Sequence, residues 1–262
     1  MCFFRITGYL NYVLFSRHRK GHKIHSPFIF DLISRVFRNK TGNDVVLKIE
    51  NQRRKCLSSE RTIRVVDLGA GSVKMKGNLR KVSDIAKHSA VPKKYGVLLS
   101  ALAAEFGKPE VIELGTSLGI STMYLASGCP ASVVYTVEAC PEKSRIAMEN
   151  FGNAGFENIR LLNGSFDNII PELKRQSVRP GIIFIDGDHR GEYLLRYFDQ
   201  LAEISNGSTV IVLDDIHYSR EMENAWDRIK QDKNVTVTVD LYRMGLVFFR
   251  GGMSRSDYVI RY

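Results

Sequence analysis

The sequence lacks long apolar runs. No stretch of its 262 residues reaches the roughly 18 apolar residues that a membrane-spanning helix needs. The apolar segment 6–15 is shorter, and basic residues follow it, whereas a secretory signal has them in front. There is also no repeat with a period of about 20 to 50 residues and no low-complexity tract, which excludes repeat and disordered architectures. We therefore expect a globular protein without a transmembrane segment.

Cysteine is also scarce. The four cysteines are Cys2, Cys56, Cys129 and Cys140, and no two of them form a C-x-x-C pair. This pattern favours reduced thiols, and we predict a cytoplasmic protein.

Acidic residues are scarce in the first part of the chain. Residues 1–100 contain 21 Lys and Arg against 6 Asp and Glu, whereas residues 101–262 contain 17 against 22. The net charge of +10 therefore belongs to the N-terminal part. A basic segment can contact nucleic acid, an anionic membrane face or an acidic substrate, and it can also be a plain solvated surface. Because no RNA-binding aromatic signature accompanies the scattered basic residues, nucleic acid is an unlikely partner.

Short apolar runs alternate with helical patterns from about Lys108 onward, which is typical of βαβ units. Strands are expected at 111–114, 133–137, 159–162, 182–185, 209–213, 235–241 and 245–249, the last two as antiparallel neighbours. Helices are expected at 120–126, 141–151, 169–174, 193–204 and 221–230. This order predicts an α/β fold with a doubly wound, mostly parallel, seven-stranded sheet.

The first 90 residues are less regular. Segments 6–15 and 28–37 have the apolar spacing of helices, whereas 51–81 is polar and basic and predicts loops. A region of this size with a basic, loop-rich half makes a weak core alone. We therefore divide the chain near Val91 into a basic N-terminal extension, 1–90, helical and loop-rich, and a main α/β domain, 91–262.

The segment Glu113-Leu-Gly-Thr-Ser-Leu-Gly119 lies where a strand turns into a helix. Glycines there let main-chain amides approach a ligand, and the helix N-terminus adds a positive field. The loop is G-x-x-x-G and lacks the G-x-G-x-x-G of dinucleotide sites. Glu113 at the strand tip would repel a pyrophosphate but suits a cation, such as the ammonium and sulfonium groups of S-adenosylmethionine. A plain tight turn is the alternative.

Glu138 ends the second strand, 23 residues after Gly115. A carboxylate at this point of a nucleotide-binding α/β fold can accept both ribose hydroxyls. It does not separate S-adenosylmethionine from a nicotinamide cofactor, and a helix-terminal acid beside Pro141 is the alternative.

A second strand-and-glycine pattern occurs at Arg64-Val-Val-Asp-Leu-Gly-Ala-Gly-Ser72. No amphipathic helix follows it, and no second strand with a terminal acid arrives at the right distance. We therefore expect the main cofactor loop at Gly115, and we leave the role of the Gly69–Gly71 loop open.

Three carboxylates follow the fourth and fifth strands: Asp186, Asp214 and Asp215. Ligands bind at the carboxyl ends of such strands, and three converging carboxylates repel each other unless a cation lies between them. Oxygen ligands favour magnesium or calcium over zinc. The alternative is that these residues cap a helix and hold a loop.

Histidine occurs beside this acidic group as His189, three residues after Asp186. At a strand end it could act as a general base, and a surface or capping histidine is the alternative. His217 is a weaker candidate. A metal site at His18, His22 and His25 is not favoured, because no acid or cysteine partner stands near them.

From Lys94 to about Lys230 the chain resembles the catechol and caffeoyl-coenzyme A O-methyltransferases, including an uncharacterised bacterial branch. The segments that carry the resemblance are Glu113–Ser121, Tyr135–Ala139, Asn163–Leu173, Phe184–Asp186 and Leu213–Asp215. Their order and spacing agree with the family, which is more specific than any one motif. The N-terminal segment His25–Asp31 resembles the same bacterial branch.

The resemblance implies a Rossmann-like fold and a site for S-adenosylmethionine. The residues that it places around this cofactor are Glu113, Gly115, Thr116, Ser117, Gly119, Ser121, Glu138, Ala139, Gly164, Ser165, Phe166 and Asp186. It implies Asp186, Asp214 and Asp215 as ligands of Mg2+. From their place at the strand end, we predict Asp186 and His189 as catalytic residues. Two positions depart from the family: Asp215 stands where an Asn is usual, and His189 stands where the family has its catalytic lysine.

Together these features predict an S-adenosylmethionine-dependent methyltransferase that methylates the oxygen of a small catechol- or phenol-like acceptor, with a metal as a possible aid. A protein that binds or modifies nucleic acid through its basic N-terminal region is the alternative. A nicotinamide oxidoreductase is less favoured, because the Gly115 loop lacks G-x-G-x-x-G. The extension 1–90 is expected to cover the substrate mouth. The oligomeric state stays open, with a homodimer as one candidate.

Overall fold

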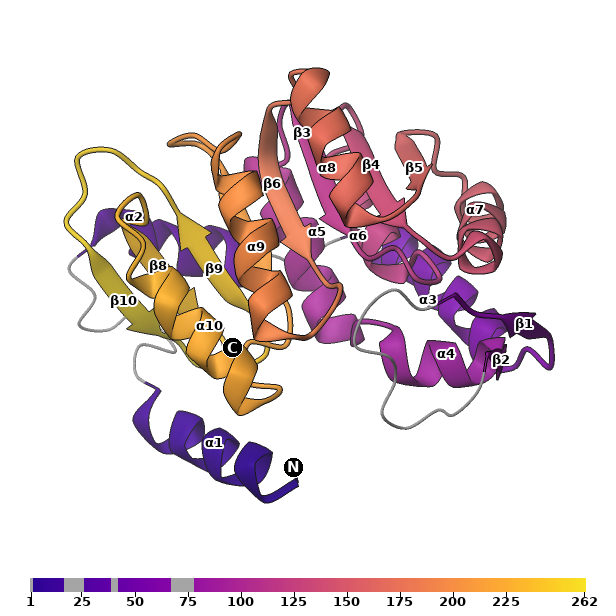
Figure 1. The fold of residues 1–262 in the computed structure, drawn as a ribbon, viewed down its shortest axis with the longest axis horizontal. Coiled ribbons are helices and arrows are strands. Elements are labelled where there is room, and N and C mark those ends of the chain that lie inside the picture. Colours follow the sequence, from indigo (N-terminus) through magenta and orange to yellow (C-terminus); the bar gives the residue numbers. More distant parts are fainter. Residues whose placement is uncertain (1, 17–25, 39–41, 67–77) are drawn as a thin grey trace.

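The computed structural model describes residues 2–16, 26–38, 42–66 and 78–262. Its centre is an eight-stranded sheet with helices on both faces (Figure 1). The strands are β3 (Glu110–Leu114), β4 (Val133–Glu138), β5 (Ile159–Asn163), β6 (Pro180–Ile185), β7 (Val210–Leu213), β8 (Val237–Asp240), β9 (Gly245–Phe248) and β10 (Ser256–Val259). Their order is β10-β8-β9-β7-β6-β3-β4-β5, and only β9 runs against its neighbours. This confirms the predicted doubly wound sheet and the antiparallel pair at its end.

The predicted number of seven strands was one too low. The additional strand, β10, pairs in parallel with β8 at the edge of the sheet. Its sequence, Ser-Asp-Tyr-Val, is short and only partly buried. A half-exposed edge strand carries a weak apolar pattern, which explains why the sequence did not predict it.

The core lies in two layers, one on each face of the sheet. Alternate strand residues point to opposite faces, so Ile182 and Phe184 pack in one layer while Ile183 and Ile185 pack in the other. The first layer is covered by α5 (Lys93–Phe106), α6 (Ile120–Gly128) and α7 (Pro141–Ala154). The second is covered by α8 (Phe166–Arg175), α9 (Gly191–Ala202) and α10 (Arg220–Lys230) (Figure 1).

The strand order reverses between β3 and β6. From β3 the chain proceeds to β4 and β5 on one side, then returns to place β6 on the other side. In folds of this kind, ligands bind at the carboxyl ends of the strands, at the point where the strand order reverses. The predicted cofactor loop follows β3, and Asp186 follows β6.

The N-terminal region is more regular than the sequence indicated. Its described elements are α1 (Cys2–Phe15), α2 (Pro27–Asp31), a π-helix, η1 (Leu32–Phe37), α3 (Asn43–Leu57), β1 (Thr62–Arg64), β2 (Leu79–Lys81) and α4 (Val82–Ser89). The expected loop at 51–81 was wrong for residues 51–57, which complete α3 around the buried side chains of Gln52 and Cys56. Asp67–Ser72, with its glycine loop, lies outside the described residues, as do His18, His22 and His25. No helix in the described ranges is long and apolar enough to cross a membrane.

These N-terminal helices share the core of the sheet. Ile29, Ile33 and Ile49 are buried in the same layer as Leu98 and Phe184. Val91 is itself buried in this common layer, so the core is continuous across the predicted division. The division of the chain near Val91 stays a prediction.

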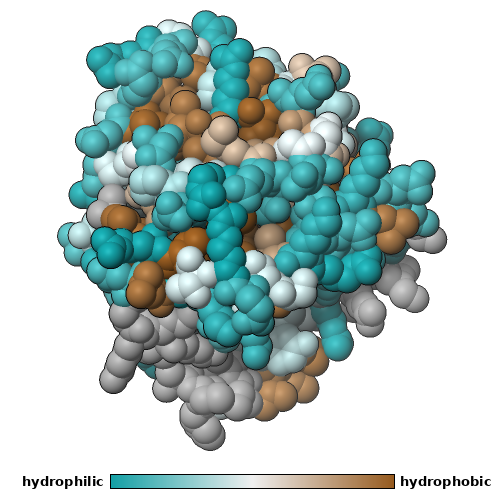
Figure 2. Space-filling model, turned by 90° about the vertical axis from the view of Figure 1, so that its right-hand side faces the viewer, coloured by the Kyte–Doolittle hydropathy of each residue, from teal (hydrophilic) through white to brown (hydrophobic). Residues whose placement is uncertain are grey.

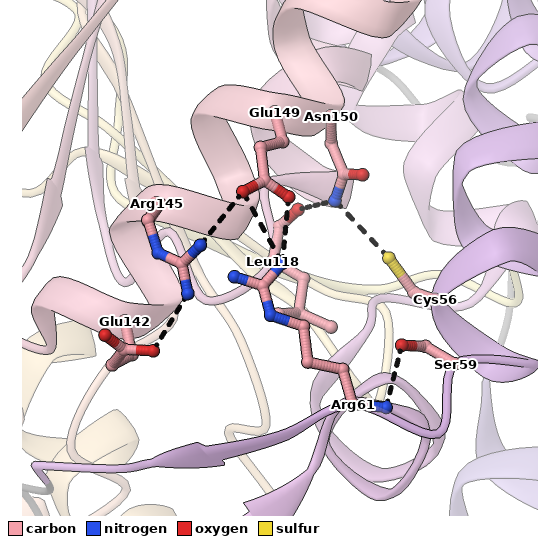
Figure 3. A network of polar contacts seen from close by, with 8 residues as sticks. All are labelled: Cys56, Ser59, Arg61, Leu118, Glu142, Arg145, Glu149 and Asn150. Carbon is pink, nitrogen blue, oxygen red and sulfur yellow. Dashed lines mark hydrogen bonds and ion pairs between the residues drawn. The ribbon is translucent and has the colours of Figure 1, made fainter.

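Polar contacts attach the N-terminal region to α7 and to the cofactor loop (Figure 3). The side-chain amide of Asn150 donates to the carbonyl of Leu118 at 2.9 Å and to the sulfur of Cys56 at 3.3 Å. Arg61 forms an ion pair with Glu149 at 3.0 Å. Hydrophilic side chains predominate on the face that carries β1, β2, α4 and α7 (Figure 2).

Candidate functional site

The loop after β3 is held against both neighbouring strands. The N–H groups of Gly115 and Thr116 donate to the carbonyl of Val137, at 3.0 and 3.2 Å. Gly115 has φ +106°, and a Cβ atom there would lie 2.3 Å from the carbonyl oxygen of Asp186. Gly119 has φ +81°, and its Cβ atom would lie 2.3 Å from the ring of Phe151. Only glycine fits either position, so the loop's path is fixed by its sequence.

Glu113 lies at the end of β3 beneath this loop and is fully buried. Its Oε2 atom accepts hydrogen bonds from the hydroxyls of Thr122 and Thr136, while its Oε1 atom has no hydrogen-bond partner. Burial raises the pKa of the Glu113 carboxyl, against the lowering effect of the hydroxyl groups around it. The unpartnered oxygen can still accept a hydrogen bond, and the predicted role of Glu113 toward a cationic ligand stays a prediction.

Glu138 joins the loop to the end of β4. Its Oε2 atom accepts from the N–H of Ser117 and its Oε1 atom from the N–H of Cys140, both at 2.9 Å. Lys143 lies 3.9 Å from the same carboxylate. The carboxylate is thereby fixed at the strand end, with further lone pairs open to hydroxyl donors.

The segment after β5 lies beside Glu138. Gly164 donates its N–H to the carbonyl of Glu138 at 3.0 Å, and Ser165 precedes the first turn of α8. The ring of Phe166 packs edge-on against Tyr197 and lies where a Cβ atom on Gly187 would be. Ala139, Ser165 and Phe166 are half-buried. The structure thus brings the strand ends of β3, β4, β5 and β6 together, as the motif order predicted.

A pocket opens at the Gly115 loop. Its lining comprises Ser89, Ala90, Val91, Gly115, Thr116, Ser117, Leu118, Ile120, Ser121 and Asp186. The hydroxyls of Ser89 and Ser117 lie 2.8 Å apart. The last turn of α4 therefore contributes to the mouth of the predicted cofactor site, which the sequence did not indicate.

The acidic group lies at the ends of β6 and β7. Asp214 is fully buried, and Arg243 binds it through two hydrogen bonds, from Nε at 2.9 Å and from Nη2 at 2.6 Å. The Nη2 atom is also 3.7 Å from Asp215. The two aspartates raise the pKa of the Arg243 guanidinium, which outweighs the lowering effect of burial. Arg243 is therefore charged and neutralises part of the acidic group.

Asp186 faces both the cofactor loop and this acidic group. Burial and the charge of Asp214 raise the pKa of the Asp186 carboxyl well above its usual value, and Arg243 opposes that shift. His189 lies 3.8 Å from Asp186 through its Nε2 atom, and its ring lies 5.7 Å from the ring of Tyr218. One third of the His189 side chain is exposed, so it can reach a ligand at the mouth.

Comparison with known proteins identifies this region. Residues 112–216 match a family model described as a methyltransferase domain. The chain carries a methyltransferase domain. The match begins in β3 and ends just after β7, so it contains the carboxyl ends of β3, β4, β5, β6 and β7.

Relatives of this methyltransferase domain include named O-methyltransferases. A catechol O-methyltransferase from Niastella koreensis is 31% identical over 124 residues, which are 46% of this chain and 55% of that protein. A Mycobacterium ulcerans protein, named only provisionally as an O-methyltransferase, is 28% identical over 84% of this chain and 83% of its own length. The chain spans about half the length of the first curated relatives it matches. The resemblance noted in the sequence is confirmed.

Solved structures share the fold. The O-methyltransferase from Bacillus cereus, in complex with S-adenosylhomocysteine, has a TM-score of 0.57 and 17% identity. The alignment covers 84% of this chain and 97% of that one. The shared architecture therefore extends beyond the segment 112–216.

The donor set predicted for magnesium does not fit a metal ion in this methyltransferase domain. In the described part of the chain, no three His, Cys, Asp or Glu side chains are grouped to hold a metal. The physical reason is that Arg243 takes both oxygens of Asp214 and approaches Asp215. Asp186, Asp214 and Asp215 lie near one another, as predicted, but the positive charge among them is a guanidinium.

His217 is not placed as a general base. Its Nε2 atom lies 2.8 Å from Asp240 and its Nδ1 atom 3.2 Å from Glu223. Burial disfavours the charged imidazole, but Asp240 and then Glu223 outweigh it and raise the pKa of His217 above 6.5. Both ring nitrogens of His217 are occupied, so of the two histidines predicted beside the acidic group only His189 remains available as a base.

Sequence reasoning missed Arg243 entirely. Arg243 lies in the turn between β8 and β9, far along the chain from the aspartates. It reaches them because β9 pairs with β7, which places Gly245 opposite Leu213. A basic residue in the tight turn after Asp240 was visible in the sequence, but only the strand order tells which acids it meets.

Proposed function

We propose that the chain is an S-adenosylmethionine-dependent methyltransferase that methylates an oxygen of a small hydroxylated acceptor, catechol-like or phenol-like. The observation that carries this proposal is the assembly of the cofactor motifs at one crevice: the Gly115 loop, Glu138, and the Ser165 segment. The methyltransferase-domain match and the O-methyltransferase relatives support it.

The cofactor end of the site has distinct parts. Glu138 would accept the ribose hydroxyls, and the Ser165–Phe166 segment would border the adenine. The unpartnered oxygen of Glu113 and the loop at Gly115 would face the methionine end. Bound S-adenosylmethionine supplies an activated methyl group on a sulfonium; the remaining tasks fall to the protein.

Those tasks are positioning and proton removal. The acceptor oxygen must lie in line with the methyl group, about 3 Å away and screened from water, and such positioning accounts for much of the rate in reactions of this kind. His189 is the proposed base that takes the proton from the acceptor hydroxyl. Asp186 lies 3.8 Å from the Nε2 atom of His189 and would help to position the imidazole.

Magnesium has no step in this proposal. The pairing of Arg243 with Asp214 argues against a metal at the acceptor side, since a metal would have to displace a buried ion pair. The acceptor itself is proposed at the level of chemical class.

A direct assay tests the proposal. The full chain is incubated with S-adenosylmethionine and a panel of catechols and phenols, and release of S-adenosylhomocysteine is followed by mass spectrometry. We expect turnover with at least one hydroxylated acceptor and a large loss of turnover in His189→Gln. Transfer to none of these acceptors, with transfer to an amine or to RNA instead, would contradict the proposed acceptor class.

A further inference from the structure

The acidic group formed by Asp214 and Asp215 already has a positive side chain of the protein beside it, that of Arg243. We call this end of the site, opposite the cofactor loop, the acceptor side. The guanidinium of Arg243 and the carboxylate of Asp214 form two parallel hydrogen bonds, at 2.9 and 2.6 Å. Such paired N–H···O bonds fix both distance and orientation. The Asp214 side chain has no exposed surface, whereas the Arg243 side chain retains 27%.

The position of Arg243 is set by the sheet. It follows Asp240, the last residue of β8, and precedes Gly245, the first of β9. Its N–H donates to the carbonyl of Leu241 at 3.0 Å, and the same carbonyl accepts from the hydroxyl of Tyr95 at 3.4 Å. The guanidinium carbon also lies 5.8 Å from the centre of the Tyr95 ring. A side chain anchored in this way is a fixed part of the site.

A divalent ion and Arg243 compete for the same charge. Magnesium requires near-octahedral oxygen ligands at about 2.1 Å. Both oxygens of Asp214 already accept from Arg243, and Nη2 lies 3.7 Å from Asp215. An ion placed among these carboxylates would meet the guanidinium at close range and be repelled. The extra negative charge of Asp215, where the related family has a neutral Asn, matches a guanidinium that has two acids to contact.

We propose that Arg243 replaces the divalent cation at the acceptor side, so that this methyltransferase domain works without a metal and Arg243 binds the acceptor oxygen. The guanidinium Nη1 atom forms no hydrogen bond to the described residues, which leaves its N–H groups for that oxygen. This inference rests on the proposed function for the identity of the ligand, but its main test does not require activity.

Manganese serves as the probe, because its binding is measured directly by electron paramagnetic resonance. The wild-type chain, freed of metals with a chelator that is then removed, is titrated with Mn2+. We expect no saturable site. One Mn2+ per chain in the micromolar range, lost in Asp214→Asn, would overturn the inference.

Variants test whether Arg243 is what keeps the metal out. In Arg243→Gln we expect a saturable Mn2+ site to appear, at least about tenfold tighter than any residual binding to the wild type, and the melting temperature to fall by on the order of 10 °C, because Asp214 is left buried without its partner. The double variant Asp214→Asn/Arg243→Gln should lose the Mn2+ site and regain part of the melting temperature. Arg175→Gln, which removes an exposed arginine paired with Glu172, is the control and should change neither. Unchanged Mn2+ binding in a folded Arg243→Gln chain would count against the inference.

The same samples separate this inference from the proposed function. S-adenosylhomocysteine binding is measured by calorimetry in a chelating buffer. Binding that appears only after Mn2+ is added leaves the methyltransferase proposal standing and removes the role of Arg243. If S-adenosylhomocysteine binds neither with nor without Mn2+, the proposed function is wrong, and Arg243 then has no acceptor oxygen to bind.

Discussion

Ser117 and Glu138 tie the loop after β3 to the end of β4: the N–H of Ser117 donates to the Oε2 atom of Glu138 at 2.9 Å. The carboxylate is therefore held at the place where a ribose would lie, before any ligand arrives. Such preorganisation lowers the ordering cost of binding.

Removal of the Glu138 carboxylate should weaken cofactor binding. We expect Glu138→Ala to raise the Kd for S-adenosylhomocysteine by roughly 5- to 150-fold, or about 1–3 kcal/mol, because ribose hydroxyls and loop amides lose their acceptor. Isothermal titration calorimetry measures this, and Glu142→Ala, in the first turn of α7 with a partly exposed side chain, is the control. Equal affinities in both variants would remove Glu138 from the site.

Two glycines, Gly115 and Gly152, should respond in opposite ways to replacement by alanine. Gly115→Ala places a Cβ atom 2.3 Å from the carbonyl oxygen of Asp186 at φ +106°, so we expect a loss of at least about 2 kcal/mol. Gly152→Ala, inside α7 with open space around it, should stabilise by about 0.5–1 kcal/mol. Urea unfolding of the two variants gives the comparison, and a tolerated Gly115→Ala would mean that the loop is not constrained as described.

The shared core predicts that the N-terminal helices contribute to global stability. Ile49 is fully buried in α3 while Leu47, two residues earlier, is 54% exposed. Ile49→Ala should lower the free energy of unfolding by about 2–5 kcal/mol and Leu47→Ala by less than about 0.5 kcal/mol. Thermal unfolding followed by circular dichroism measures both, and a single transition is expected in each. If Ile49→Ala instead splits the transition in two, the N-terminal region folds as a separate unit.

Because folding raises the pKa of His217, we expect part of the chain's stability to depend on pH. Its pKa is raised in the folded chain, so its stabilising contribution is fully present below the unfolded value of 6.5 and is lost as the pH rises through the folded pKa. The melting-temperature difference between wild type and His217→Gln should therefore be larger near about pH 6 than near about pH 8.5. A difference that does not change between these pH values would show that folding does not raise the pKa of His217.

The sequence predicted the strand ends well because each one carries its own local pattern. An apolar strand followed by Gly115, Glu138 or Asp186 is visible within a few residues, and the direction of parallel strands brings such ends together. The cofactor side of the proposed site is therefore outlined by the sequence alone.

What could not be predicted depends on contacts distant in sequence. Arg243 meets Asp214 through the pairing of β9 with β7, and Ser89 meets Ser117 through the packing of α4. A polar segment such as 51–57 becomes helical because a few of its side chains are buried by tertiary packing, which outweighs local propensity. The magnesium prediction did not take Arg243 into account for the same reason: the positive charge that pairs with Asp214 comes from a turn 29 residues further along.

The central claim is that the crevice at Gly115 and Glu138 binds the adenosyl cofactor. Calorimetric titration of the full chain with S-adenosylhomocysteine in a chelating buffer tests it directly, with NAD titrated in parallel. The account predicts one S-adenosylhomocysteine per chain in the micromolar range, unchanged by magnesium, and no heat of binding with NAD. Binding of NAD without binding of S-adenosylhomocysteine would contradict it.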